Sequence, residues 1–333
     1  MTLAATPTQA GCFSLAWVTK MTRAQSSIMP INLDGILLPV TTTFTSAEVF
    51  DAEAFSANLA KWNDTGVIGY VVLGSTGERV NLNQREYLQV IETARRAVPE
   101  TLSLIVGAGQ QSTRATIEEI RSAADAGAEA VLVITPHYYR SAVSQEVLVS
   151  HYRAVADASP VPIILYSMPD LTGITIEPDT AASLSDHKNI IGIKDSSADI
   201  AKLSETVRLV RSDFAVMIGN GTVLCEALLA GSRGGILAVG CVAPQLCLEI
   251  YRAVQAGEVE QARSLQDKLT PLARAVTKTF GIGGLKMAME MAGFAGGAVR
   301  APLRRPSEAV RTEISQLIGD ANAAEGVARA SRP

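Results

Sequence analysis

The chain has 333 residues, of which 47% are hydrophobic and 19% charged, and its formal net charge at pH 7 is −4. This composition is typical of a globular protein with a large core, and the acidic balance offers no basic footprint for nucleic acid. No apolar run reaches the roughly 18 residues that a membrane helix requires. The four cysteines show neither a C-x-x-C pair nor zinc spacing, which favours a reducing compartment. We therefore expect no nucleic-acid partner and no membrane partner.

Residues 1–32 form an N-terminal extension that we expect to be disordered. Its first 30 residues contain Lys20 and Arg23 but no acidic residue, a composition found in organellar transit segments. A translation start at Met21 or Met29 would explain the segment equally well. The expected compartment is the cytoplasm, with the mitochondrion as the alternative if the extension is a transit segment.

Short apolar segments alternate with helical patterns from residue 33 onward. The eight segments are 35–40, 69–74, 102–108, 130–135, 162–167, 190–194, 214–219 and 234–240. Most are apolar on both faces, as in parallel strands that are covered by helices. Eight βα units of this spacing predict an α/β fold, a (β/α)8 TIM barrel. An open doubly wound sheet is the alternative, but it needs a glycine-rich loop where "TTTFTS" follows the first strand.

Helical patterns continue after the eighth predicted strand. We assign residues 33–243 to the barrel and residues 244–318 to a C-terminal helical extension. Residues 319–333 are rich in alanine and other small residues, and we expect them to form a disordered tail.

Polar side chains stand at the ends of several predicted strands. Lys194 ends the sixth strand and Tyr166 closes the fifth, while "GSTGE" follows the second and "TPHYYR" the fourth. A lysine at a strand end is often only a residue that reaches solvent. In a (β/α)8 barrel, however, the carboxyl ends of the strands build the active site, so these groups would share one rim.

A lysine at that rim could act as a nucleophile. Desolvation disfavours the charged form of an amine, and a neutral amine can attack a carbonyl to form a Schiff base. The iminium then withdraws electrons, which permits aldolase chemistry. Tyr166 could relay protons in such a reaction, although a tyrosine with its ring in the core and its hydroxyl in water is the simpler interpretation.

The "GSTGE" loop could hold an anion, because successive backbone N–H groups in such a loop form a cradle for a carboxylate or a phosphate. A plain glycine turn with a capping hydroxyl is the alternative. The three histidines, His137, His151 and His187, lie in unrelated segments. We therefore expect no metal site and no bound cofactor.

Six motifs in order, "PVTTTF", "GSTGE", "PHYYR", "LYSMPDLTG", "GIKDSS" and "GGLKMAME", make the chain resemble the dihydrodipicolinate synthase and N-acetylneuraminate lyase family. Members of this family are class I, pyruvate-handling aldolases on a TIM barrel with a C-terminal helical part. The resemblance extends over residues 33–317. It implies that Lys194 is the Schiff-base lysine, that Tyr166 relays protons, and that Ser75 and Thr76 bind the pyruvate carboxylate.

The resemblance implies further roles. Ile236 would lie near the pyruvate methyl group, and Glu78 would serve the loop rather than the chemistry. Tyr139 matches a tyrosine that such enzymes contribute across a dimer interface. The family is commonly a homotetramer built as a dimer of dimers, and the resemblance implies the same assembly here.

Two departures bear on the substrate. Leu171 stands where dihydrodipicolinate synthases place an arginine that holds the distal carboxylate of aspartate semialdehyde. The motifs are instead most similar to 4-hydroxy-2-oxoglutarate aldolases, and Arg140 and Ser196 match that subgroup as substrate contacts. The same subgroup has asparagine where this chain has Thr76.

The expected activity is cleavage of a 4-hydroxy-2-oxo acid, with 4-hydroxy-2-oxoglutarate giving pyruvate and glyoxylate as the leading case. The alternatives are a 4-hydroxy-tetrahydrodipicolinate synthase and a sugar-acid aldolase or dehydratase of the same family. A non-catalytic barrel that binds a 2-oxo acid is a further alternative. So is a phosphate-binding barrel, because "AGSRGG" precedes the eighth strand.

Overall fold

The computed structural model describes residues 31–330, with side chains to residue 321. Nearly all of the predicted extension 1–32 lies outside the described residues, and so does the compartment signal that it would carry. No helix in the described range is both long and apolar enough to cross a membrane.

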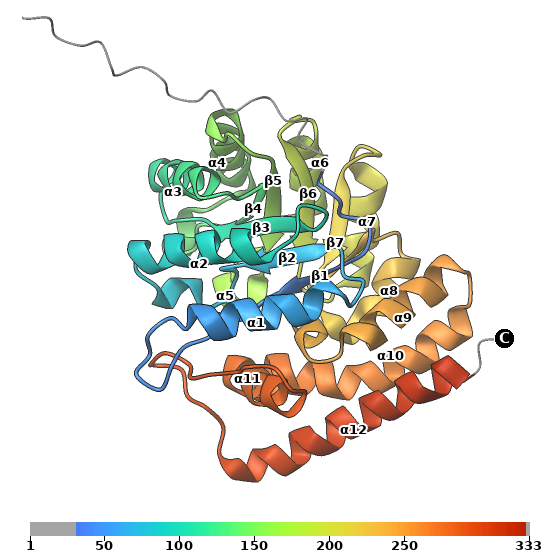
Figure 1. Ribbon diagram of the computed structural model, residues 1–333. Coiled ribbons are helices and arrows are strands. Elements are labelled where there is room, and N and C mark those ends of the chain that lie inside the picture. Colours follow the sequence, from blue (N-terminus) through green and yellow to red (C-terminus); the bar gives the residue numbers. More distant parts are fainter. Residues whose placement is uncertain (1–30, 331–333) are drawn as a thin grey trace, which may run out of the picture. The chain divides into compact units, whose positions relative to one another are not determined.

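Eight parallel strands close into a barrel in chain order, with β1 hydrogen-bonded to β8 (Figure 1). This confirms the predicted (β/α)8 TIM barrel, and each strand falls on one of the eight apolar segments. The strands are β1 (Ile36–Pro39), β2 (Gly69–Val72), β3 (Ser103–Ala108), β4 (Ala130–Ile134), β5 (Ile163–Ser167), β6 (Ile190–Asp195), β7 (Ala215–Ile218) and β8 (Gly234–Ile236).

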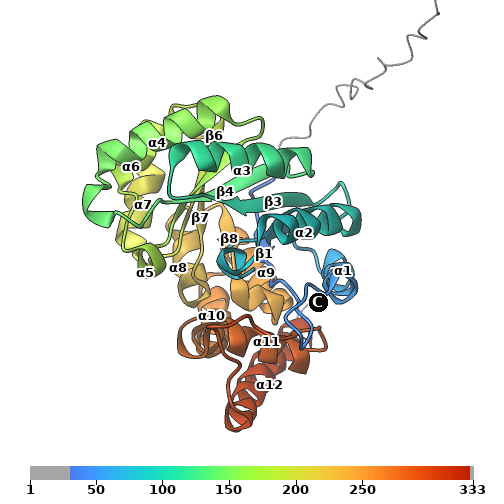
Figure 2. The same cartoon turned by 90° about the vertical axis from the view of Figure 1, so that its left-hand side faces the viewer.

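Helices follow the strands and cover the outside of the barrel (Figure 2). They are α1 (Ala52–Asn63), α2 (Gln84–Ala97), α3 (Thr113–Asp125), α4 (Gln145–Ala158), α5 (Pro169–Thr172), α6 (Pro178–Ser185), α7 (Ile200–Leu209) and α8 (Leu224–Leu229). Local sequence fixes where they begin. At α2, the Asn83 side chain accepts from the Glu86 N–H and the Glu86 carboxylate accepts from the Asn83 N–H, each at 3.0 Å.

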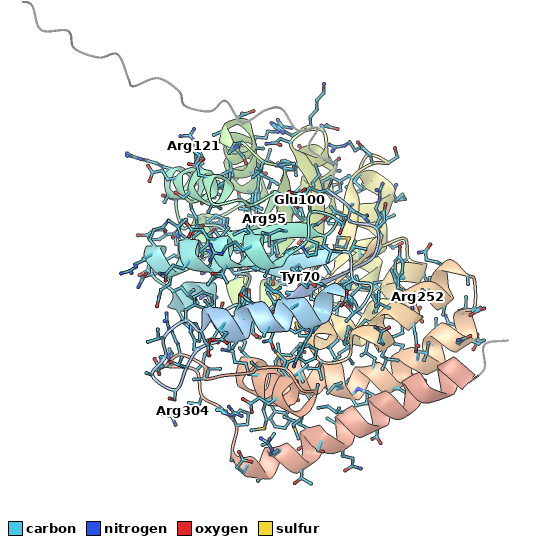
Figure 3. The ribbon with its side chains drawn as sticks, viewed as in Figure 1. Tyr70, Arg95, Glu100, Arg121, Arg252 and Arg304 are labelled. Carbon is cyan, nitrogen blue, oxygen red and sulfur yellow. The ribbon has the colours of Figure 1, made fainter. Side chains whose placement is uncertain are left out.

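Successive side chains along each strand point alternately into and out of the barrel, which divides the core into two layers. One layer fills the barrel, with Leu37, Val71 and Ile164 among its members. The other lies between the strands and the helices, and full burial of one such side chain stabilises the fold by roughly 1.5–3 kcal/mol. Tyr70 of β2 belongs to this outer layer, and its hydroxyl donates to Asn63 of α1 over 2.8 Å (Figure 3).

Four more helices follow the barrel: α9 (Pro244–Gln255), α10 (Val259–Arg274), α11 (Gly281–Met291) and α12 (Glu308–Ala330). Both views place α10, α11 and α12 together beneath the barrel. Helix α12 continues to Ala330, through most of the residues 319–333 that the sequence assigns to a tail. Alanine has the highest helix propensity, so an alanine-rich end can prolong a helix.

Candidate active site

Lys194 of β6 and Tyr166 of β5 lie side by side within the barrel. They are register partners on neighbouring strands, and the Lys194 Nζ atom lies 4.5 Å from the centroid of the Tyr166 ring. Lys194 is only 5% exposed and Tyr166 4%. Their neighbours Ile193 and Leu165 face the helices, so the alternation of the strands turns this pair inward. The amine is thus held over an aromatic face at the carboxyl end of the barrel.

Gly219, directly after β7, makes room for this arrangement. A Cβ atom on Gly219 would lie 1.9 Å from the Ser196 Oγ atom and 2.7 Å from the Lys194 Cε atom. Ser196 and Lys194 therefore border the same small space, which any other side chain at residue 219 would fill. Sequence reasoning did not identify Gly219 as functional, although it ends the seventh predicted strand at the rim.

Asp195 shapes the turn after β6. Its Oδ1 atom accepts from the Ser197 N–H at 2.8 Å, and burial raises the pKa of the Asp195 carboxyl group. The backbone nearby is fixed as well, because the Ser196 N–H donates to the Ser167 carbonyl at 3.0 Å. These contacts hold the residues that flank Lys194.

The "GSTGE" loop, residues 74–78, follows β2 at the same end of the barrel. The Thr42 hydroxyl donates to the Gly77 carbonyl at 2.6 Å, and the Glu78 N–H donates to the Ser75 carbonyl at 3.2 Å. Glu78 has a φ of 55°, a left-handed conformation that is uncommon outside glycine. Ser75 and Thr76 are partly buried within this tightly shaped loop.

The other predicted site residues occupy two environments. Ile236 of β8 is fully buried and belongs to the same inner core as Tyr166. Tyr139 is 71% exposed, whereas the Arg140 side chain lies against the end of α5, where a Cβ on Gly173 would be 2.9 Å from the Arg140 Cδ atom. Lys194, Tyr166 and Ser196 are thus brought together by one chain, while Tyr139 remains on the surface.

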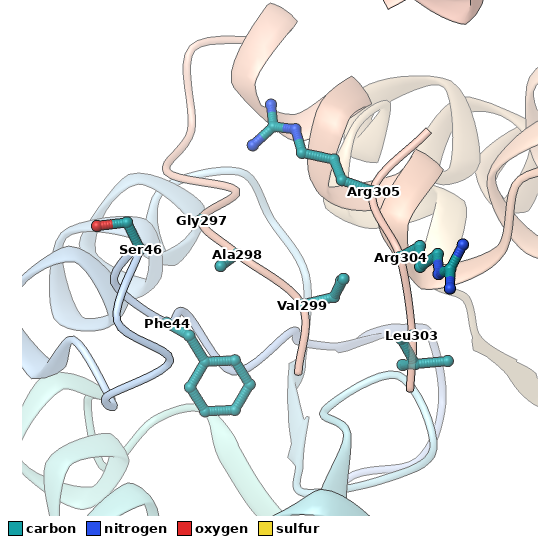
Figure 4. A pocket seen from close by; sticks show the side chains of 8 residues that line it. All are labelled: Phe44, Ser46, Gly297, Ala298, Val299, Leu303, Arg304 and Arg305. Atoms are coloured by element: carbon teal, nitrogen blue, oxygen red, sulfur yellow. The ribbon is translucent and has the colours of Figure 1, made fainter. Parts of the chain in front are cut away.

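A surface hollow of about 460 Å³ lies elsewhere, between the loop after β1 and the segment before α12 (Figure 4). Its lining includes Phe44, Ser46, Leu303 and Arg305, but neither Lys194 nor Tyr166. We therefore do not assign the reaction to it. A second hollow, of about 610 Å³, is lined by Tyr139 together with residues of the loops after β3 and β4.

Lys286 of α11 is a second residue that sequence reasoning missed. Its Nζ atom lies 2.6 Å from the Glu78 Oε1 atom, so Glu78 has a partner far along the chain. The signal was present in "GGLKMAME", where a lysine stands between apolar residues of a helical segment.

A buried lysine over a tyrosine ring at the strand ends of a (β/α)8 barrel fits a carbon–carbon lyase of the class I aldolase type. The chain belongs to the dihydrodipicolinate synthetase family, whose family model matches residues 32–321. This confirms the family that the motifs predicted.

Relatives and solved structures agree with the family. The chain is 34% identical to a 4-hydroxy-tetrahydrodipicolinate synthase of Methanospirillum hungatei, over 80% of this chain and 91% of the relative. It is 35% identical to one of Methanosphaerula palustris, over 81% and 93%. A dihydrodipicolinate synthase structure from Bacillus anthracis superposes with a TM-score of 0.83 at 28% identity, covering 87% of this chain and 98% of that one.

A prophage protein of the same family from E. coli K12, solved in complex with pyruvate, superposes with a TM-score of 0.81 at 29% identity. The match covers 87% of this chain and 99% of the prophage protein. The curated relatives carry the name that the sequence reasoning held as an alternative. They support the family and the reaction class, and they favour that alternative over the 4-hydroxy-2-oxoglutarate aldolase.

Proposed function

We propose that the protein is a Schiff-base lyase that joins pyruvate to an aldehyde or releases it from one, with Lys194 as the nucleophile. The observation that carries this proposal is the buried Lys194 amine, held 4.5 Å from the centroid of the Tyr166 ring. A pyruvate complex of a similar structure supports the choice of the 2-oxo acid.

In the cleavage direction, the Lys194 amine adds to the C2 ketone of a 4-hydroxy-2-oxo acid and water is lost, which leaves an iminium. Tyr166 accepts the proton of the C4 hydroxyl group, and the electrons of the breaking C3–C4 bond move into the iminium. The aldehyde leaves and an enamine remains on Lys194. A proton added at C3 and hydrolysis of the resulting iminium then release pyruvate and the free lysine. Synthesis is the same sequence reversed.

The chain's own groups bind and orient pyruvate in this scheme. Backbone N–H groups and hydroxyls of Ser75 and Thr76 hold its carboxylate, because such loops present several donors to one anion. Ile236, fully buried at the end of β8, faces its methyl group. Ser196 borders the same space as Lys194 and hydrogen-bonds the substrate beside the new C–N bond.

Two aldehydes are candidates for the second substrate. The names of the relatives favour aspartate semialdehyde, as in 4-hydroxy-tetrahydrodipicolinate synthesis. Leu171 favours glyoxylate instead, because a 61% exposed leucine on α5 cannot pair with a distal carboxylate. Arg140 lies against the same short helix at Gly173, and we propose that its guanidinium group binds the carboxylate of glyoxylate, which is next to the aldehyde carbon.

Reductive trapping tests the core of the proposal. Purified protein is incubated with pyruvate, reduced with borohydride and read by intact mass and peptide mapping. The expected result is one pyruvate adduct on Lys194 that is absent from Lys194→Ala. A folded protein that gives no adduct at saturating pyruvate would contradict the mechanism.

Turnover rates measured with each candidate aldehyde then show which one is the second substrate. Faster turnover with aspartate semialdehyde supports the activity named for the relatives, and faster turnover with glyoxylate supports the smaller substrate. Leu171→Arg is expected to raise the ratio of the rates toward aspartate semialdehyde, because it adds a cation for the distal carboxylate.

Tyr139 enters the proposal through a second copy of the chain. Its side chain is 71% exposed and its ring lies 5.0 Å from that of Tyr138, with a hollow beside the pair. We propose that Tyr139 completes the proton relay of a neighbouring subunit in a homotetramer. Activity that is constant per subunit on dilution to the monomer, or that is unchanged in Tyr139→Ala, would contradict this.

A further inference from the structure

Glu78 and Lys286 form an ion pair whose two side chains are both fully buried. The Lys286 Nζ atom lies 2.6 Å from Glu78 Oε1, donates to the Ala298 carbonyl at 2.6 Å, and stands 4.6 Å from the centroid of the Phe44 ring. Burial lowers the pKa of the Lys286 amine, while the neighbouring Glu78 carboxylate opposes that shift. Apolar residues of similar volume often stabilise such a site as well as a buried pair does. The pair is therefore better explained by the geometry that it enforces.

That geometry concerns the "GSTGE" loop. Glu78 is its last residue and adopts a left-handed conformation, which a glutamate keeps only where its surroundings demand it. Both of its carboxylate oxygens are engaged by the C-terminal part of the chain: Oε1 by Lys286, and Oε2 by the Arg300 N–H at 3.0 Å. The loop is thus anchored at its end by residues that lie beyond the barrel.

The same C-terminal segment also holds the chain on either side of the loop. The Arg300 guanidinium group donates to Glu86 at the start of α2 over 2.7 Å and to the Asn81 carbonyl over 2.9 Å. On the opposite side, the hydroxyl of Thr42 holds the Gly77 carbonyl. The loop is therefore clamped between the segment after β1 and the segment from α11 to Arg300.

We propose that Lys286 is a positioning residue for the pyruvate carboxylate: by fixing Glu78, it sets the Ser75 and Thr76 donors at the distance from Lys194 that a bound 2-oxo acid needs. This inference rests on the proposed function. It makes the C-terminal helices a working part of the site rather than an appendage. Lys286 itself, with a fully buried side chain, does not contact the substrate.

The deciding measurement is the pyruvate concentration that gives half-maximal borohydride trapping on Lys194, in the full-length protein and in Lys286→Met. We expect this concentration to rise roughly tenfold or more, because small misplacements of binding groups cost one to two orders of magnitude. The yield at saturating pyruvate and the turnover per trapped lysine should stay within about threefold of the wild type, since Lys194 and Tyr166 are untouched. An unchanged half-saturating concentration overturns the inference.

Arg263→Met is the matched control. It also removes a cation of the C-terminal helices from an ion pair, the one with Glu226 at 3.0 Å, which joins α10 to α8 and not to the loop. The half-saturating pyruvate concentration should be unchanged in this variant. A rise equal to that of Lys286→Met would show that losing any ion pair of the C-terminal helices has this effect, and it would overturn the positioning role.

Glu78→Gln combined with Lys286→Met guards against a single variant that does not fold, because it leaves no unpaired buried charge. We expect the melting temperature of this double variant to lie near that of the wild type, while its half-saturating pyruvate concentration stays raised. Hydrogen exchange of residues 73–82 gives a readout without pyruvate and should be faster in the double variant, with the strands unchanged. If the double variant exchanges residues 73–82 at the wild-type rate, the inference is overturned. If the wild-type protein forms no pyruvate adduct, the proposed function is overturned, and the exchange rates alone then test whether Lys286 holds the loop.

Discussion

Lys194 and Lys286 are both buried in the described part of the chain, yet their surroundings differ. Lys286 has a carboxylate and a carbonyl each within 2.6 Å and a side chain with no exposed surface. Lys194 lies over the Tyr166 ring, and no carboxylate of the described residues forms an ion pair with it. Burial alone therefore does not make a lysine reactive. Lys194, the proposed nucleophile, differs from Lys286 because no carboxylate of the described residues pairs with it and a small space remains beside it.

Exchanging each lysine for methionine is the strongest test of this contrast. Lys194→Met is expected to lose all measurable turnover, because it removes the amine that is proposed to form the Schiff base. Its melting temperature should equal or exceed that of the wild type, since an amine without a carboxylate partner is replaced by an apolar chain of similar length. Residual turnover above a few per cent, in protein free of wild-type contamination, would place the nucleophile elsewhere.

Tyr166→Phe should leave the ring beneath Lys194 but remove the proton relay. General acid–base groups contribute typically 10²–10⁴-fold, and we expect a loss of kcat in that range. Adduct formation with pyruvate should persist at longer incubation, which separates the relay from the nucleophile. Steady-state rates together with time courses of trapping measure both, and a wild-type kcat would remove Tyr166 from the relay.

Lys286→Met should lower the stability of the fold, whereas Lys194→Met should not. Removing one member of a buried ion pair leaves the other unpaired, at a cost of about 3–5 kcal/mol in the free energy of unfolding. Urea unfolding monitored by circular dichroism measures this loss. If Lys194→Met proved to be the more destabilising exchange, the contrast between the two lysines would be reversed.

Gly219→Ala tests the space beside Lys194. The new Cβ would lie 1.9 Å from Ser196 Oγ and 2.7 Å from Lys194 Cε, so both side chains must move. We expect kcat/KM to fall by roughly 10²-fold through misplacement of the amine. Gly319→Ala, where a Cβ meets nothing within 4 Å, is the control and should keep wild-type kinetics. Equal kinetics of the two variants would show that the space is dispensable.

His151 extends the comparison to a third buried base. Its Nδ1 atom lies 2.9 Å from the Thr113 hydroxyl, and burial lowers the pKa of His151 from 6.5 to about 4. A depressed histidine pKa means that the unfolded chain binds the proton more tightly, so stability is full above pH 6.5 and falls between pH 6.5 and pH 4. The loss is about 1 kcal/mol near pH 5.5 and approaches about 3 kcal/mol at pH 4. Urea unfolding of the wild type and His151→Gln across this range should show a smaller loss in the variant.

The sequence predicted the parts of the molecule that depend on local pattern. The strands were recognisable because burial on both faces removes polar residues from short runs, and Lys194 and Tyr166 stood out as exceptions at the strand ends. Gly219 was not recognisable, because its role comes from what two neighbouring side chains need rather than from its own chemistry. The Glu78–Lys286 pair was missed for a similar reason: its partners stand 208 residues apart, and no local pattern joins them.

The clamp on the "GSTGE" loop also orders events during synthesis. Glu78 accepts a hydrogen bond from the Arg300 backbone, which lies 222 residues further along the chain. All eight strands, and Lys194 with them, leave the ribosome before that residue does. In the proposed mechanism, a truncated chain that ends before Lys286 would contain Lys194 but lack the contacts that anchor the proposed carboxylate-binding loop. The proposed affinity for the 2-oxo acid would then depend on the part of the chain that is synthesised last.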